Sequence, residues 1–333
     1  MVKVLFGKPS EQSPKELGAL NMFNYQTTLG QAEFNNPIFT ASGCAGSGKE
    51  LSQFFDLTEL GAVVTKSIML KPRSGRATPR MAETPSGMLN SIGLQGPGID
   101  LFLENDVPWL RDQGATIVVS IAGESVEDYA VLARKLRAVP GISALEVNIS
   151  CPNVENRGQV FACHPETARA AIQAVRRNIG GELPIIAKLT PDVTSIVEIA
   201  QEVVAAGADS LALINTVLGM VIDTNTMRPK LAGKTGGLSG PAIRPVAVRA
   251  IYQVHAALPH VKILGMGGVS SGQDAFELIL AGASAVSIGT ATFGNPMAAM
   301  KVKEELRNEL INHGFDSLRE AVGYAHRSEG SLI

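Results

Sequence analysis

Short apolar segments alternate with helical patterns along most of this chain. Eight runs are almost wholly apolar and end in small or polar residues: 37–43, 62–68, 116–122, 144–150, 184–190, 210–216, 262–268 and 285–291. A stretch with helical spacing follows each run, at 49–60, 99–113, 124–138, 165–180, 194–206, 242–257, 271–281 and 295–313. Strands that are buried on both faces have this composition, and parallel sheets contain such strands. The pattern therefore predicts eight consecutive βα units.

Eight βα units between residues 37 and 313 match the number and size of a (β/α)8 TIM barrel. A doubly wound α/β fold also alternates strands with helices, but it usually has fewer strands and a nucleotide-binding fingerprint after the first strand. We predict a single-domain (β/α)8 barrel over residues 23–333, with long loops after strands 2, 4 and 6. Residues 1–22 are predicted to form an N-terminal extension of unknown role.

Composition and charge narrow the possible functions. The 333 residues carry 29 Lys and Arg against 31 Asp and Glu, and only 5% of them are aromatic. No basic surplus exists to neutralise a nucleic-acid backbone or an anionic membrane. The three cysteines, Cys44, Cys151 and Cys163, form no disulfide framework, which predicts a cytoplasmic location. They are too few for an ordinary iron–sulfur cluster, and no metal site is predicted.

Polar residues gather where the predicted strands end, and chemistry in a barrel is found at that rim. The rim carries Ser42, Lys66, Ser67, Asn148, Lys188, Asn215, Gly267, Gly268, Gly289 and Thr290. A single strand-end lysine can snorkel or cap a helix. Two lysines and two asparagines on one rim instead favour a pocket that binds an anion and reads amide groups.

Glycines follow the last two predicted strands, in GMGG (265–268) and SIGT (287–290). Barrel enzymes often bind phosphate with the loops after strands seven and eight, because glycine lets backbone N–H groups approach the oxygens. Taken alone, either motif could instead be explained as a tight turn between a strand and a helix. Neither motif, nor GCAGSGK (43–49), has the spacing of a dinucleotide fingerprint or a P-loop.

The segment NISCPN (148–153) follows the fourth predicted strand and places Cys151 in the rim loop. A thiol there can act as a nucleophile or as a general base. The alternative interpretation is that Cys151 is only a small buried cysteine. Cys163 lies beside His164, and we interpret that pair as incidental loop residues.

A set of motifs now points to one family. The segments are ASGCAGSGKE (41–50), VTKSIMLKPRSGRATPR (64–80), NSIGLQGPG (90–98), NISCPN (148–153), INT (214–216), GGLSGPAIRPVA (236–247), GMGGV (265–269) and SIGTA (287–291). Together they resemble the dihydroorotate dehydrogenases, which are FMN enzymes. Cys rather than Ser in NISCPN resembles the soluble class 1 enzymes. GCAGSGKE, NSIGLQ and GGLSGPAI resemble class 1B, which passes electrons to NAD through a partner subunit.

The resemblance implies roles for individual residues. The positions that match FMN-binding residues are Ser42, Lys66, Ser67, Ser120, Asn148, Lys188, Ile214, Gly240, Gly267, Gly268, Gly289 and Thr290. The positions that match substrate-binding residues are Lys66, Asn90, Ser91, Ile92, Gly93, Leu94, Asn148, Asn215 and Thr216. Cys151 matches the catalytic base. Ser120 is a departure, because relatives usually have an asparagine there that contacts FMN.

The implied activity is oxidation of (S)-dihydroorotate to orotate in de novo pyrimidine (UMP) biosynthesis. The implied partner subunit holds FAD and a [2Fe–2S] cluster, and a homodimer of this chain forms the core of a heterotetramer. A fumarate-using class 1A enzyme and another FMN barrel reductase of a pyrimidine are the alternatives. A tRNA dihydrouridine synthase is disfavoured by the near-neutral charge. A non-enzymatic barrel that binds a phospholigand would need neither Cys151 nor two rim lysines.

Overall fold

The computed structural model describes residues 23–150, 164–181 and 183–327. Its centre is a parallel sheet of eight strands, in the order β3-β16-β15-β10-β9-β8-β7-β4. The strands are β3 (Ile38–Thr40), β4 (Val63–Val64), β7 (Ile117–Ile121), β8 (Ile142–Asn148), β9 (Ile185–Lys188), β10 (Ser210–Leu213), β15 (Lys262–Met266) and β16 (Ala285–Ile288). A parallel bridge between Phe39 and Ala62 joins β3 to β4 and closes the sheet. The predicted (β/α)8 barrel is confirmed.

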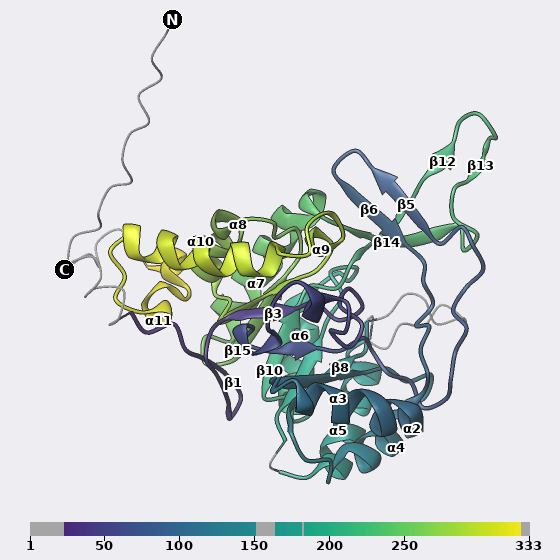
Figure 1. Ribbon diagram of the computed structural model, residues 1–333, viewed down its shortest axis with the longest axis horizontal. Helices are drawn as coiled ribbons and strands as arrows, with labels where there is room; N and C mark the ends of the chain where they lie inside the picture. The colour runs from purple at the N-terminus through teal and green to yellow at the C-terminus, as the bar shows by residue number, and fades with distance from the viewer. Residues whose placement is uncertain (1–22, 151–163, 182, 328–333) are drawn as a thin grey trace, which may run out of the picture.

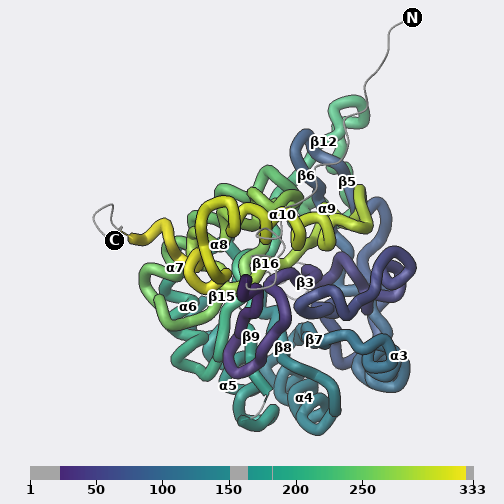
Figure 2. The backbone as a smooth tube through the Cα atoms, turned by 60° about the vertical axis from the view of Figure 1, so that its left-hand side comes forward, coloured from purple at the N-terminus to yellow at the C-terminus, as the bar shows by residue number. Residues whose placement is uncertain are grey.

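Helices surround the strands, as Figure 2 shows. They are α2 (Ile99–Leu101), a π-helical turn (Phe102–Asp106), α3 (Val107–Asp112), α4 (Val126–Leu136), α5 (Pro165–Ile179), α6 (Ile196–Ala205), α7 (Arg244–Ala257), α8 (Gly272–Ala281), α9 (Ala291–Gly294), α10 (Ala298–Asn312) and α11 (Leu318–Ala321). Short 3₁₀ turns precede α7 at Pro241–Ile243 and follow α11 at Tyr324–His326. Seven of the eight predicted helical stretches coincide with these elements.

The helix predicted over 49–60 is wrong. The segment forms two separate 3₁₀ turns, Leu51–Gln53 and Leu57–Glu59. The carboxylate of Asp56 accepts hydrogen bonds from the backbone N–H and the hydroxyl of Thr58. An aspartate that caps a new turn in this way competes with continuation of a helix through its own position.

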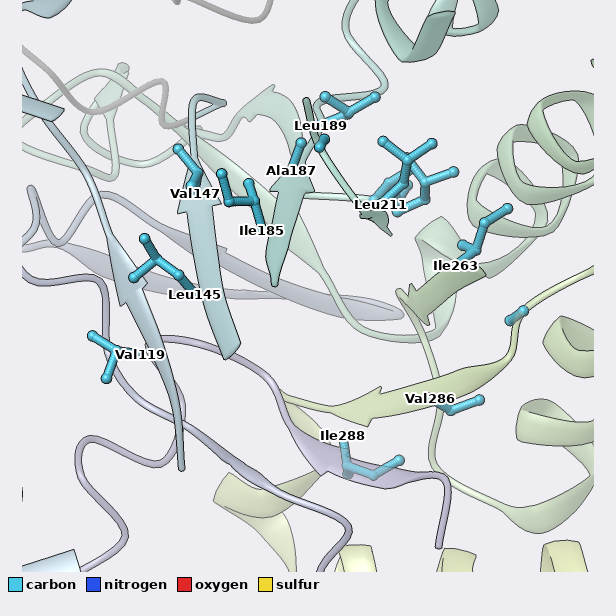
Figure 3. Close-up of a cluster of buried hydrophobic side chains, with 14 of the residues drawn as sticks. Val119, Leu145, Val147, Ile185, Ala187, Leu189, Leu211, Ile263, Val286 and Ile288 are labelled. Carbon is cyan, nitrogen blue, oxygen red and sulfur yellow. The ribbon is translucent and has the colours of Figure 1, made fainter. Parts of the chain in front are cut away.

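Alternate residues of each strand face opposite sides of the barrel wall, and both sides are buried. One set packs between the strands and the helices; Figure 3 shows Val119, Leu145, Ile185, Leu211 and Val286 from this set. The other set fills the barrel interior and consists of Phe39, Ala62, Val64, Val118, Ala144, Ile186, Ala212, Leu264, Met266 and Ala285. The period of two along each strand explains why the predicted runs are apolar throughout.

An unpredicted hairpin packs against the apolar interior set. It consists of β1 (Thr27–Leu29) and β2 (Ala32–Phe34), which pair antiparallel. Leu29 and Phe34 join the interior cluster, and the Phe34 and Phe39 rings lie 4.7 Å apart between centroids. Leu29 and Phe39 are fully buried, and Phe34 nearly so. The hairpin therefore contributes to the same core as the strands of the barrel.

The long loops predicted after strands 2 and 6 contain strands of their own. β5 (Met81–Thr84), β6 (Gly87–Asn90), β11 (Val217–Met220) and β14 (Thr235–Ser239) form an antiparallel sheet in the order β11-β14-β6-β5, which we call the arm sheet. A small hairpin, β12 (Ile222–Asp223) with β13 (Arg228–Pro229), extends from it, and Figure 1 shows both projecting from the barrel. The predicted loop after strand 4 includes 151–163, which lie outside the described residues, as do 1–22. No helix among the described residues is long and apolar enough to cross a membrane.

Candidate active site

Two adjoining cavities with shared lining residues lie where the barrel strands end, partly beneath the arm sheet. One has a volume of about 420 Å³ and the other about 320 Å³. Both are lined by Ser42, Lys188, Asn215, Thr216 and Thr290, together with Cys44, Met88 and Ser239. Met88 belongs to β6 and Ser239 to β14, so the arm sheet supplies part of the wall. The rim residues predicted from the strand ends thus line these two adjoining cavities.

The larger cavity, which we call the glycine chamber, contains the loops after the last two strands. Ile214, Gly240, Gly267, Gly268, Gly289 and Thr290 line it. Gly268 has a φ of +75°, and a Cβ there would lie 2.7 Å from Cβ of Arg244. The backbone N–H groups of Gly268 and Gly289 donate no hydrogen bond to another described residue. Free N–H donors on a backbone that tolerates no side chain are suited to binding phosphate oxygens. The residues therefore fit the phosphate of FMN.

The smaller cavity, which we call the lysine chamber, is lined by Lys66, Ser67, Asn90, Asn148 and Lys188, and by residues 92–94. Burial lowers the pKa of Lys66, and the nearby positive charge of Arg80 lowers it further. Neither Lys66 nor Arg80 takes part in an ion pair with another described residue. Two nearby cations without a carboxylate partner create a positive potential, which favours an anionic ligand in this chamber.

Lys188 lies between the two chambers and is only 4% exposed. Its Nζ donates a hydrogen bond to Oγ of Ser42 at 2.8 Å and lies 3.6 Å from Oε1 of Glu146. Cys44 lines both chambers as well. Burial raises the pKa of its thiol to about 11, although Lys188 and Lys66 act in the opposite direction. Cys44 is therefore protonated at neutral pH and is no thiolate nucleophile there.

Hydrogen bonds fix the orientation of two amide side chains in the lysine chamber. Nδ2 of Asn148 donates to Oγ of Ser67 at 3.0 Å, and its Oδ1 accepts from the backbone N–H of Ser150 at 3.2 Å. Nδ2 of Asn215 donates to Oγ of Ser150 at 2.8 Å, and its Oδ1 accepts from the N–H of Thr216 at 2.8 Å. Amides held from both ends form a pre-organised set of polar groups for a planar ligand.

The predicted substrate segment, residues 90–94, divides into lining and supporting residues. Asn90, Ile92, Gly93 and Leu94 line the lysine chamber, whereas Ser91 is fully buried behind it. Oγ of Ser91 accepts a hydrogen bond from Nη1 of Arg76 at 3.0 Å, and the backbone N–H of Arg76 donates to the carbonyl of Ile92 at 2.9 Å. Arg76, which the sequence analysis did not single out, thus supports the loop from behind.

Ser120 lies below the chambers and lines neither of them. It is fully buried, and its Oγ donates to Oε1 of Glu146 at 2.7 Å. Glu146 is likewise fully buried, and the sequence analysis missed it. The signal was present, because Glu146 is two residues before Asn148 on one strand and therefore faces the same side.

The predicted catalytic residue, Cys151, lies outside the described residues, as does Cys163. The last described residue before it is Ser150, whose hydroxyl donates to Oδ1 of Asn148 at 3.1 Å. The chain therefore enters the segment with Cys151 directly from the amide cluster of the lysine chamber. Among the described residues, no group of three or more His, Cys, Asp or Glu side chains could hold a metal ion.

Free backbone donors after strands seven and eight of a (β/α)8 barrel, beside a cationic chamber, are typical of barrel proteins that bind phosphate-bearing ligands. The model of the dihydroorotate dehydrogenase family matches residues 24–310. The chain therefore belongs to the dihydroorotate dehydrogenase family, as its motifs predict.

Curated relatives match almost the whole chain. One from Desulforamulus reducens is 48% identical over 91% of this chain and 99% of its own length. One from Desulforudis audaxviator is 50% identical over 89% of this chain and 95% of its own length. One from Bacillus pumilus is 47% identical over 88% and 94%. Each of these proteins is named dihydroorotate dehydrogenase B (NAD(+)), catalytic subunit.

Proposed function

We propose that this chain oxidises (S)-dihydroorotate to orotate in pyrimidine biosynthesis, as the catalytic subunit of an NAD-dependent dihydroorotate dehydrogenase. The observation that carries this proposal is the sharing of eight lining residues by the glycine chamber and the lysine chamber. The first suits the phosphate of a flavin nucleotide, and the second suits an anionic, amide-bearing ring. A ligand in each chamber would meet the other at Lys188 and Thr290, which line both.

FMN is the proposed cofactor of this chain. Gly267, Gly268 and Gly289 would hold its phosphate through backbone N–H groups, and Gly240 and Thr290 would complete that end. Ser42, Lys66, Ser67, Asn148, Lys188 and Ile214 would surround the remainder, with Ser120 acting from below. When bound, FMN supplies the acceptor for the hydride that leaves C6 of dihydroorotate.

The remaining roles fall to side chains of the lysine chamber. Lys66 and the backbone of residues 92–94 would hold the substrate carboxylate. Asn90, Asn148, Asn215 and Thr216 would bind the amide groups of the ring and stabilise the charge that develops on it. Cys151 would remove the proton from C5, on the side of the substrate opposite the flavin. Lys188 would place a positive charge beside the reduced cofactor.

Electrons are proposed to leave through a second protein. The sequence contains no dinucleotide fingerprint, and its three cysteines cannot supply four cluster ligands. The relatives' names specify both NAD(+) and a catalytic subunit, which supports a partner. We propose that the partner carries FAD and a [2Fe–2S] cluster and binds a homodimer of this chain, giving a cytoplasmic heterotetramer.

A comparison of electron acceptors tests this function. The purified chain, loaded with FMN, is given dihydroorotate together with an artificial dye, NAD or fumarate, and orotate is measured. We expect rapid turnover with the dye and little with NAD until the partner subunit is added. Efficient NAD reduction by the chain alone would contradict the need for a partner. Rapid fumarate reduction would instead favour the class 1A alternative.

A further inference from the structure

A carboxylate is buried in the barrel interior, directly below the proposed flavin site. Glu146 on β8 is 0% exposed. Its Oε1 accepts a hydrogen bond from Oγ of Ser120 at 2.7 Å and lies 3.6 Å from Nζ of Lys188. Its Oε2 is buried and has no hydrogen-bond partner among the described residues. Burying a carboxylate that is only partly satisfied is costly, so a role beyond packing is needed to explain it.

A directional chain of hydrogen bonds links this carboxylate to the lysine chamber. The single hydroxyl proton of Ser120 points to Glu146, so the 2.8 Å contact between Ser67 and Ser120 must use the proton of Ser67. Oγ of Ser67 in turn accepts from Nδ2 of Asn148 at 3.0 Å. Every donor in the chain therefore points towards Glu146. The carboxylate thus reinforces, through Ser120 and Ser67, the same orientation of the Asn148 amide that the backbone N–H of Ser150 favours at Oδ1.

The same carboxylate balances the charge of Lys188. Lys188 is buried, and among the described residues its Nζ also donates a hydrogen bond to the neutral side chain of Ser42. Glu146 is therefore the anion that offsets this cation within the described residues. A buried ammonium and a buried carboxylate at this separation influence a neighbouring group as a dipole rather than as a full positive charge.

We propose that Glu146 is a positioning residue that sets the reduction potential of the bound flavin through Lys188 and orients Asn148 for the substrate through Ser120 and Ser67. This inference rests on the proposed binding of FMN. With Glu146 ionised, the positive charge beside the flavin is attenuated. Loss of the carboxylate charge exposes the full charge of Lys188, which stabilises the reduced, anionic cofactor.

The central test is the near-isosteric variant Glu146→Gln, studied as the FMN-loaded chain. The two-electron reduction equilibrium should shift at least tenfold towards reduced FMN, which corresponds to a rise in midpoint potential of about 30 mV. The matched control is Ser210→Ala, which removes a different buried polar group, a hydroxyl that has no hydrogen-bond partner within the described part of the chain. The control should leave the potential unchanged. An unchanged or lowered potential in Glu146→Gln would overturn the inference.

The second variant, Ser120→Ala, breaks the chain to Asn148 but leaves Glu146 beside Lys188. We expect a several-fold higher KM for dihydroorotate, with a smaller change in flavin potential than Glu146→Gln produces. A KM equal to that of the wild type would contradict the orientation of Asn148 by Glu146.

Failure of the proposed function and failure of this inference give different results. A wild-type chain that takes up no FMN contradicts the proposed function itself. A yellow wild-type chain whose potential is insensitive to Glu146→Gln contradicts this inference alone.

Discussion

The two ends of the barrel interior are built from the same strands and differ completely in chemistry. Towards the hairpin most inward-facing positions are apolar, with Val118, Ala144, Ile186 and Ala212 packed beside Phe39. Two residues further along three of these strands, the same face carries Ser120, Glu146 and Lys188. Such a step spans about 7 Å. Stability and chemistry are thus separated along each strand, so substitutions at the two ends should produce different kinds of defect.

The largest effect is expected at the polar end, from Cys151→Ala. Loss of a general base should slow flavin reduction by dihydroorotate by roughly 10²- to 10⁴-fold, while FMN binding and thermal stability stay near wild type. Anaerobic stopped-flow absorbance of the flavin measures this rate. Cys151→Ser should be slow at neutral pH and recover as pH rises, because a hydroxyl loses its proton, and so can act as a base, only at a higher pH than a thiol does. A fully active alanine variant would remove Cys151 from the proposed mechanism.

At the apolar end, Phe39→Ala should produce the opposite defect. Phe39 is fully buried and packs against Phe34, so its truncation should lower the free energy of unfolding by about 3–5 kcal/mol. Urea unfolding followed by circular dichroism measures the loss. The folded fraction should keep its kcat, since the side chain lies below the chambers. A large fall in kcat without a loss of stability would show that the two ends are not separable.

A smaller effect is expected from Gly268→Ala in the glycine chamber. The positive φ and the 2.7 Å approach to Arg244 make any side chain there strained. If the loop must move to relieve this strain, the free energy of FMN binding is less favourable by about 1–2 kcal/mol, which corresponds to roughly tenfold weaker binding. Fluorescence titration with FMN measures the dissociation constant. Gly181→Ala is the matched control, because a Cβ at Gly181 would meet no atom within 4 Å. Equal FMN affinity in both variants would contradict the phosphate site.

The smallest effect concerns the pH dependence of anion binding. Burial and Arg80 hold the pKa of Lys66 below its usual 10.5, so its charge is present at low pH and is lost as pH rises through the lowered value. Orotate affinity should therefore begin to fall at a lower pH than an ordinary lysine would give. Arg80→Ala should move this fall to higher pH, and Lys66→Arg should abolish it. Calorimetric titrations across the alkaline range, compared between variants, measure the shift. Identical profiles in all three proteins would exclude Lys66 as the titrating group.

The sequence predicts the barrel well because its strands are buried on both faces and form continuous apolar runs. It fails where a strand is short or lies outside the barrel, as in the hairpin at 27–34 and the arm sheet. Two of the arm strands, β5 and β11, alternate between partly buried and exposed positions, and the glycines of β6, β11 and β14 are typical of loops. Their pairing depends on two segments more than 100 residues apart, Gly87–Asn90 and Thr235–Ser239, which no local pattern connects.

The candidate site was predictable where polar residues end an apolar run, as at Lys66, Asn148 and Lys188. Glu146 was missed because it lies inside such a run, where a charge is read as an interruption rather than as an inward-facing group. Ser91 lies behind the chamber wall although its neighbours line it, because Arg76 holds its hydroxyl from the other side. Such contacts depend on the folded loop and have no counterpart in the spacing of the sequence.

The most direct test of the central claim is an anaerobic titration of the FMN-loaded chain, without any partner protein, against (S)-dihydroorotate. The proposed chemistry predicts that the flavin absorbance is lost as substrate is added, with one orotate formed for each FMN reduced. A chain that binds no FMN, or a bound flavin that dihydroorotate does not reduce, would contradict the assignment of this barrel as a dihydroorotate-oxidising flavoprotein.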